Sequence, residues 1–414
     1  MSMQSDLRNP ELGYFDEGMN LTDASSYGSV CREFGQASIL PPVSYRSKVF
    51  SELENEKVWT RSWVAVGLLQ QIPNPGDLLP FTIGFHGIHV QRNRDGTILA
   101  RMNRHQHGGC RFVPEQCRTG TQTKCTITSC NYTRDSDVMS AGENGENTDL
   151  MYKFIGQVPE RLAPVKCETW GPFIFVNLDP ACGPLADYLG HLTDQIGPCM
   201  EGHLTLKAKK WLDFQCNWKI AGAVFTGVAR PPAGPPQVVG EDGSATYAQA
   251  VVPADIGIED SGDAAPQILS GKPASPLEDM KLFWLFPNVL LVVGRRHLAI
   301  TLLQATGAGK CLYRFFLLTS ESGANDVNDE GTRAVLYERW LSFLRANGAA
   351  AEAMYRDAVQ WGTSNRPGTA IRDLPVEENY SSYLLNRFLV SKIRLEHRYY
   401  WNAPIMDAAM TMRR

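Results

Sequence analysis

The spacing of hydrophobic and polar positions predicts a small all-β domain in the first half of the chain. Residues 45–59 repeat apolar side chains at helical spacing, and residues 63–66 form an apolar run typical of a buried strand. Short alternating segments separated by turn residues follow. Within them, Asp95-Gly96 stands between two apolar runs, a pattern typical of a β-hairpin. We therefore predict an all-β domain with a flanking N-terminal helix over residues 40–180.

The second half of the chain combines strand and helix patterns. Apolar positions alternate over two neighbouring segments between residues 283 and 304, as in paired strands. Residues 332–361 carry an apolar stripe at helical spacing, and Asn347-Gly348 within it predicts a kink or an interruption. We therefore predict an α+β domain over residues 181–393.

The remaining segments flank or interrupt these two domains. Residues 1–39 are rich in Ser, Gly, Asp and Asn, which predicts an extended or partly disordered arm. Residues 228–275 are dense in Pro, Gly and Ala, which predicts a long loop or lid. Residues 380–393 are expected to form a last amphipathic helix, and residues 394–414 a C-terminal tail.

Composition and charge narrow the classes of function. The chain has 414 residues, of which 43% are hydrophobic and 20% charged, as in an ordinary globular protein. A net charge of −4 argues against a nucleic-acid-binding surface. No apolar run reaches the roughly 18 residues of a membrane span, and the polar N-terminus predicts no secretory signal. We therefore expect a cytoplasmic protein with neither nucleic acid nor membrane as a partner.

One short segment concentrates residues that can bind metals. Four cysteines lie there beside two histidines, a grouping typical of a metal site or of the remains of one. These residues are His105, His107, Cys110, Cys117, Cys125 and Cys130.

Several segments, taken in order, resemble the α subunits of Rieske-type aromatic-ring-hydroxylating oxygenases. No single segment is specific, but their order and spacing are. The matching segments include Trp63-Val64-Ala65-Val66-Gly67, Pro75-Gly76-Asp77, Trp170-Gly171, Asn217-Trp218-Lys219 and Phe286-Pro287-Asn288. The resemblance implies an α+β chain, with an N-terminal all-β Rieske-like domain and a C-terminal α+β domain of the helix-grip, START-like kind.

The resemblance also places the four ligand positions of a Rieske cluster. Such a cluster needs two thiolates on one iron and two imidazoles on the other. The positions hold His105, His107, Cys125 and Thr128, of which only His107 and Cys125 keep the implied residue type. We interpret them as remnants of a cluster site and expect the chain to carry no cofactor.

Three further cysteines leave two alternatives open. Cys110, Cys117 or Cys130 could join the remaining ligands around zinc, which accepts two His and two Cys. They could also complete an atypical [2Fe–2S] cluster.

The implied mononuclear iron site has lost more of its ligands. The family binds this iron with two histidines and one carboxylate, next to an acidic residue that links the iron to a neighbouring cluster. Gly227 stands at the acidic position, Arg230 and Pro235 at the two histidine positions, and Glu352 near the carboxylate position. We therefore expect no metal there and assign no catalytic residue.

The histidine count supports this expectation independently. Of the 8 histidines, only His297 and His397 follow residue 210. Neither has the local spacing of a facial triad, so both are interpreted as ordinary structural histidines.

These observations lead to a hypothesis about function. We expect a non-catalytic, structural or regulatory α-like subunit that supports an active Rieske oxygenase α subunit in a trimer-based hetero-oligomer, with a ferredoxin or reductase reached through that partner. The alternatives are an active oxygenase with atypical metal ligands that hydroxylates or demethylates a small organic substrate, an enzyme of another kind, and a small-molecule sensor or carrier.

Overall fold

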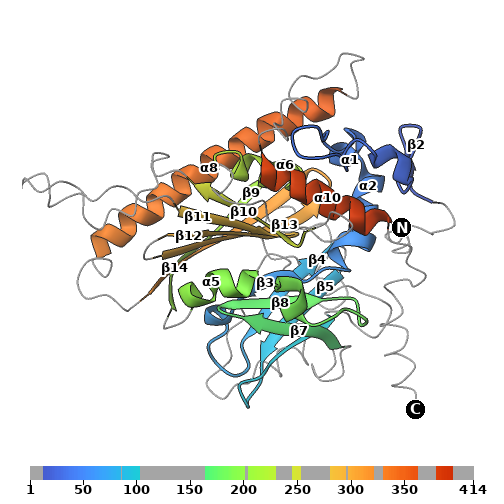
Figure 1. Ribbon diagram of the computed structural model, residues 1–414. Coiled ribbons are helices and arrows are strands. Elements are labelled where there is room, and N and C mark those ends of the chain that lie inside the picture. The colour runs from blue at the N-terminus through green and yellow to red at the C-terminus, as the bar shows by residue number, and fades with distance from the viewer. Residues whose placement is uncertain are drawn as a thin grey trace, which may run out of the picture. The chain divides into compact units, whose positions relative to one another are not determined.

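The computed structural model describes most of both predicted domains. The described residues are 13–84, 86–102, 164–200, 204–229, 245–252, 280–294, 297–320, 330–361 and 379–394. They form two compact units (Figure 1). Among the described residues, the first unit contains residues 55–188, and the second contains residues 13–54 and 189–394.

The first unit is built on a six-stranded antiparallel sheet with the strand order β3-β8-β7-β6-β5-β4. Its strands are β3 (Val64–Leu68), β4 (Leu78–Ile83), β5 (His86–Arg92), β6 (Ile98–Met102), β7 (Pro164–Trp170) and β8 (Phe173–Asn177). The short helical turns η3 (Asn55–Trp59) and η4 (Leu69–Gln71) and the helix α4 (Leu185–Leu189) accompany it. Asp95 and Gly96 form the β5–β6 hairpin turn, where Gly96 has a positive φ of 85°. The described part of this unit agrees with the predicted all-β domain.

One buried histidine in this sheet has an unusual environment. The His89 side chain on β5 is fully buried, and neither ring nitrogen has a hydrogen-bond partner among the described residues. Its neighbour across the ladder on β6 is the cationic Arg101. Burial, with the charge of Arg101 as a second cause, lowers the pKa of His89 to about 3. The imidazole is therefore neutral at physiological pH.

This environment predicts a pH-dependent stability. The pKa of His89 is 6.5 in an unperturbed chain and about 3 in the folded one, so between these values only the unfolded state binds the proton. The free energy of unfolding should fall by about 2 kcal/mol between pH 7 and pH 5 on account of this group. We expect urea denaturation of His89→Leu to show that much less loss than the wild type over this range. An identical pH dependence in the two proteins would contradict the assignment.

The second unit contains the other six-stranded antiparallel sheet, with the order β10-β11-β12-β13-β14-β9. Its strands are β9 (Leu204–Phe214), β10 (Tyr247–Val252), β11 (Met280–Leu285), β12 (Val289–Val293), β13 (His297–Gly307) and β14 (Lys310–Ser320). Its helices are α1 (Val43–Arg46), α2 (Lys48–Glu54), α5 (Leu192–Met200), α6 (Trp218–Thr226), α8 (Glu330–Trp361) and α10 (Tyr380–Arg394). Helices α6, α8 and α10 lie over one face of this sheet (Figure 1). The mixture of sheet and helix confirms the predicted α+β class.

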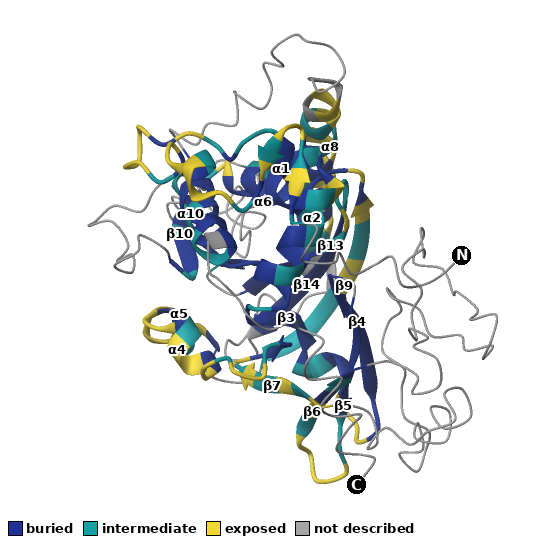
Figure 2. Ribbon diagram, turned by 90° about the vertical axis from the view of Figure 1, so that its right-hand side faces the viewer, coloured by how far each residue is buried: buried dark blue, intermediate teal, exposed yellow. Residues whose placement is uncertain are grey.

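The helices are held on the sheet by close packing. Figure 2 shows α6 and much of β13 and β14 as buried, whereas exposed residues gather at the outer end of α8 and on α4 and α5. Gly222 on α6 lies directly against the Trp284 indole on β11, where a Cβ would overlap the ring.

None of the described helices is both long enough and apolar enough to cross a membrane.

Helix α8 corrects one prediction. Asn347-Gly348 does not interrupt it, because α8 is continuous from Glu330 to Trp361. The absence of a side chain at Gly348 leaves room for the Phe214 ring, which a Cβ would overlap. The Asn347 side chain accepts a hydrogen bond of 3.2 Å from the Tyr313 hydroxyl. The dipeptide that resembled a helix break is instead a packing site.

The described part of the N-terminal segment is more ordered than predicted. Residues 13–39 contain the two-stranded hairpin β1 (Phe15–Asp16) and β2 (Met19–Asn20) and the turn η2 (Ala24–Tyr27). Tyr27 is fully buried, and its hydroxyl donates to the Leu21 carbonyl at 2.6 Å. Buried aromatic contacts, which composition alone does not reveal, hold this segment in place.

This segment is also fastened to α10 within the second unit. The Arg387 guanidinium donates to the Cys31 and Arg32 carbonyls at 3.1 and 3.2 Å. The Phe34 ring packs edge-on against Tyr380, with ring centroids 5.0 Å apart. Residues 13–54, including α1 and α2, thus group with the second unit, whereas the sequence pattern assigned residues 40–54 to the β domain.

Candidate functional site

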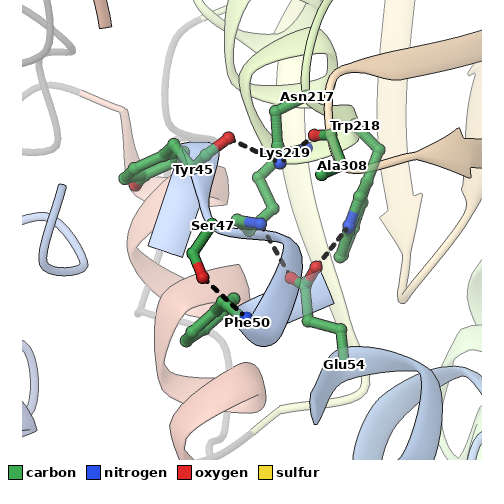
Figure 3. A network of polar contacts seen from close by, with 8 residues as sticks. All are labelled: Tyr45, Ser47, Phe50, Glu54, Asn217, Trp218, Lys219 and Ala308. Atoms are coloured by element: carbon green, nitrogen blue, oxygen red, sulfur yellow. Dashed lines mark hydrogen bonds and ion pairs between the residues drawn. The ribbon is translucent and has the colours of Figure 1, made fainter. Parts of the chain in front are cut away.

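Helix α6 directly precedes the positions implied for iron binding, and hydrogen bonds fix the start of this helix. The Asn217 side chain caps the helix by accepting a hydrogen bond of 3.0 Å from the Lys219 backbone N–H. The Asn217 amide also donates to the Tyr45 and Ala308 carbonyls, at 3.0 and 2.8 Å (Figure 3). One side chain therefore joins α6 to helix α1 and to the turn between β13 and β14.

A buried ion pair holds the first turn of α6 to helix α2. Lys219 Nζ lies 2.7 Å from Glu54 Oε1, and the two side chains are 1% and 2% exposed (Figure 3). The Trp218 indole donates to the other carboxylate oxygen at 3.4 Å. The ammonium also lies 5.2–5.5 Å from the ring centroids of Tyr45, Phe50 and Trp218.

Burial and pairing act in opposite directions on these two groups. Burial raises the pKa of the Glu54 carboxyl, while Lys219 and the Trp218 hydrogen bond lower it. Burial lowers the pKa of Lys219, while Glu54 raises it. Each charge thus depends on its partner to offset the cost of leaving water.

Removing one partner should therefore destabilise the protein far more than removing both charges. We expect Lys219→Met to lower the free energy of unfolding by about 3–5 kcal/mol, since Glu54 is left buried without a counter-charge. The double variant Lys219→Met/Glu54→Gln should recover much of that loss, because the introduced amide is uncharged and its oxygen can still accept from Trp218. Chemical denaturation measures both.

The matched control is a more exposed ion pair. Arg46 pairs with Glu17 at 2.5 Å, and the Glu17 side chain is 41% exposed. Arg46→Met should cost about 1 kcal/mol or less. Equal losses for Lys219→Met and Arg46→Met, or a double variant as unstable as Lys219→Met, would contradict this account of the pair.

At the opposite end of α6, the position implied for the acidic residue that links the iron to a neighbouring cluster has no side chain. The helix ends at Thr226, and the exposed Gly227 follows as its C-cap. The Thr226 hydroxyl donates to the Gly222 carbonyl at 2.9 Å, and Asn379 donates to the Ala223 carbonyl at 3.0 Å. The helix end is thus satisfied by hydrogen bonds. Arg230 and Pro235 lie outside the described residues.

Glu352 belongs to helix α8, and its side chain contacts the segment just before the start of α6. Its carboxylate accepts a hydrogen bond of 2.7 Å from the backbone N–H of Gln215, just before α6 begins. The nine residues of α6 span about 13 Å at 1.5 Å per residue. The structure therefore places Glu352 away from Gly227, the implied position of the linking acid.

Glu352 instead has a structural role that substitution can test. Glu352→Ala removes the acceptor of the Gln215 N–H and should lower the free energy of unfolding by about 1 kcal/mol. Glu352→Gln keeps an acceptor oxygen and should change it by less than about 0.5 kcal/mol. The exposed Glu338 on the same helix provides the control substitution Glu338→Ala. Equal effects of Glu352→Ala and Glu338→Ala in thermal or chemical denaturation would contradict this role.

The other predicted metal ligands stay predictions. Among the described residues, no three or more His, Cys, Asp or Glu side chains are grouped so as to hold a metal ion. The cluster positions and the alternative ligands lie outside those residues, as does His397. They are His105, His107, Cys110, Cys117, Cys125, Thr128 and Cys130.

His297 is a structural residue, as predicted. It begins β13 and is buried, and its Nε2 accepts a hydrogen bond of 3.2 Å from the Trp340 indole. Gly294 lies so close that a Cβ there would contact the imidazole ring at 2.5 Å.

The sequence analysis missed the Lys219–Glu54 pair. Lys219 lies in a segment that was recognised, but nothing in the pattern marks Glu54 as its partner. A charged residue in the amphipathic helix at residues 45–59 is expected on the solvent side.

Comparison with known proteins places this fold in a class. No family model matches the chain. It is 25% identical over 224 residues to the N,N-dimethyl phenylurea N-demethylase subunit alpha of Sphingobium sp. (strain YBL2), covering 51% of this chain and 48% of that protein. It is 29% identical over 187 residues to the glycine betaine monooxygenase oxygenase subunit of Chromohalobacter salexigens, covering 45% and 40%. Each match spans less than half of the relative's length.

Solved structures match over more of the chain. A naphthalene 1,2-dioxygenase aligns with a TM-score of 0.59 at 14% identity, covering 95% of this chain and 98% of that one. The quaternary ammonium Rieske monooxygenase CntA aligns with a TM-score of 0.58 at 14% identity, covering 88% and 97%. The fold is that of a Rieske-type non-haem iron oxygenase α subunit, and the predicted resemblance to this class is confirmed.

The comparisons also correct one expectation. We expected the chain to carry no cofactor, but its relatives and structural neighbours are Rieske non-haem iron oxygenases, a class that carries a [2Fe–2S] cluster and iron. The general expectation of a cofactor-free chain is therefore wrong for a protein of this class.

Proposed function

We propose that this chain is an α-type subunit of a multicomponent Rieske oxygenase. It supports an active α subunit and does not itself catalyse the reaction at the implied iron site that follows α6. The observation that carries the proposal is that Gly227, at the implied position of the linking acid, has no side chain, while Glu352, near the implied carboxylate position, is committed to a hydrogen bond elsewhere. Glu352 is hydrogen-bonded at the start of α6, and Gly227, which has no ligating side chain, follows its end.

The contrast between scaffold and site supports this role. The start of α6 is anchored by the Asn217 cap and the Lys219–Glu54 pair, two arrangements that require specific buried partners. The same helix ends in a residue without a side chain. A chain used for its shape needs the first feature, whereas the resemblance implies an acidic side chain at the second in a chain that links its iron to a neighbouring cluster.

We further propose the kind of assembly. The chain would join an active α subunit in a trimer-based hetero-oligomer in the cytoplasm, and a ferredoxin or reductase would deliver electrons to that partner. The relatives are named as an N-demethylase subunit alpha and as a monooxygenase oxygenase subunit, which supports a multicomponent setting.

The experiment is to express the chain alone and together with a complete Rieske oxygenase α subunit from the same organism. We expect the two to co-purify at a fixed ratio, and the complex to resist heat inactivation better than the active subunit alone. The chain alone, with ferredoxin and reductase, should turn over no substrate of the complex. Turnover by the chain alone, or failure of the two to associate, would contradict the proposal.

A further inference from the structure

Five ring-bearing side chains gather between α6, α8 and the helix-covered face of the sheet. We call them the aromatic cluster: Phe225 on α6, His297 on β13, Phe315 on β14, and Trp340 and Phe343 on α8. Four of them are buried, and Phe343 is half-buried. The cluster thus occupies the interior beside the last turn of α6.

Trp340 is the centre of this cluster. Its ring centroid lies 6.0 Å from His297, 6.0 Å from Phe315 and 5.8 Å from Phe343. Phe343 in turn packs edge-on against Phe225 at 5.3 Å. The indole is therefore enclosed by rings from the sheet and from its own helix, and Phe343 connects it to α6.

The Trp340 indole also makes one directed polar contact. Its Nε1–H donates to His297 Nε2 at 3.2 Å. Aromatic walls with one placed polar group are also the features with which ligand pockets hold and orient small molecules. Here the ring that they hold belongs to the chain itself.

We propose that the Trp340 indole fills an aromatic site beside the end of α6 that would otherwise bind a small aromatic molecule. The wild-type chain then accepts no small aromatic molecule at this place. Without the indole, the cavity accepts flat heteroaromatic molecules that carry an N–H donor, because His297 offers the acceptor and the neighbouring rings offer the walls.

The inference deepens the proposed function, since it concerns the region beside Gly227, and it rests on that function only for its biological meaning. The cavity can open in Trp340→Ala whether or not the chain supports another subunit. Conversely, failure to associate with an α subunit says nothing about the cavity.

The test compares indole with benzofuran, which has nearly the same shape but lacks the N–H donor. We expect indole to raise the melting temperature of Trp340→Ala, benzofuran to raise it less, and neither to affect the wild type. The double variant Trp340→Ala/His297→Leu should lose the preference for indole. Phe343→Ala, which opens the half-buried rim but keeps the indole, should respond to neither.

A milder variant covers the case in which Trp340→Ala does not fold. Trp340→Leu keeps an apolar side chain on α8 and leaves a smaller space, which should favour pyrrole over furan. Two results would overturn the proposal: a wild-type response to indole that Trp340→Ala loses, or folded Trp340 variants without any preference for the N–H ligand.

Discussion

The second unit depends on a buried ion pair between Lys219 and Glu54. Lys219 and Glu54 meet in an interior lined by Tyr45, Phe50 and Trp218, where neither could stay charged without the other. The pair joins residues 165 positions apart in the chain. Through it, helix α2 near the N-terminus fixes the start of α6, and α6 in turn packs on the sheet and α8. The N-terminal segment is therefore part of this unit, although it precedes the β domain in the sequence.

This anchoring makes the two ends of α6 very different. At the start, a capping amide, an ion pair and the Glu352 carboxylate satisfy neighbouring polar groups. At the other end, Gly227 brings no functional group, and the adjacent interior is filled by the aromatic cluster around Trp340. The fold of an oxygenase α subunit is thus held together by these contacts at both ends of α6.

Much of the fold could be predicted because it follows from local periodicity. Three features depend only on residues that are close in the sequence. They are the Asp95-Gly96 hairpin, the alternation of apolar positions over β11–β13, and the apolar stripe of α8. The errors arose where a distant partner decides the outcome. Gly348 resembles a helix break until the Phe214 ring is seen against it, and the polar N-terminal segment is ordered by Tyr27 and by Arg387 on α10.

The candidate site was predictable to a similar degree. Motif spacing predicts Gly227 and Glu352 as positions of the implied iron site, and both lie among the described residues. The sequence could not show that Glu352 is bonded to Gln215, because that contact spans 137 positions. Nor could it reveal the aromatic cluster, whose members come from four separate elements and share no motif.

In our account, the assembled oxygenase turns over its substrate without the implied iron site of this chain. The most direct measurement is the turnover number of the co-purified complex with Glu352→Gln in this chain, which keeps the hydrogen bond to Gln215 but weakens a carboxylate ligand. Our account predicts a turnover number within about twofold of the unmodified complex, since a twofold change corresponds to only about 0.4 kcal/mol in the barrier. A loss of a hundredfold or more, with the complex still assembled, would contradict it.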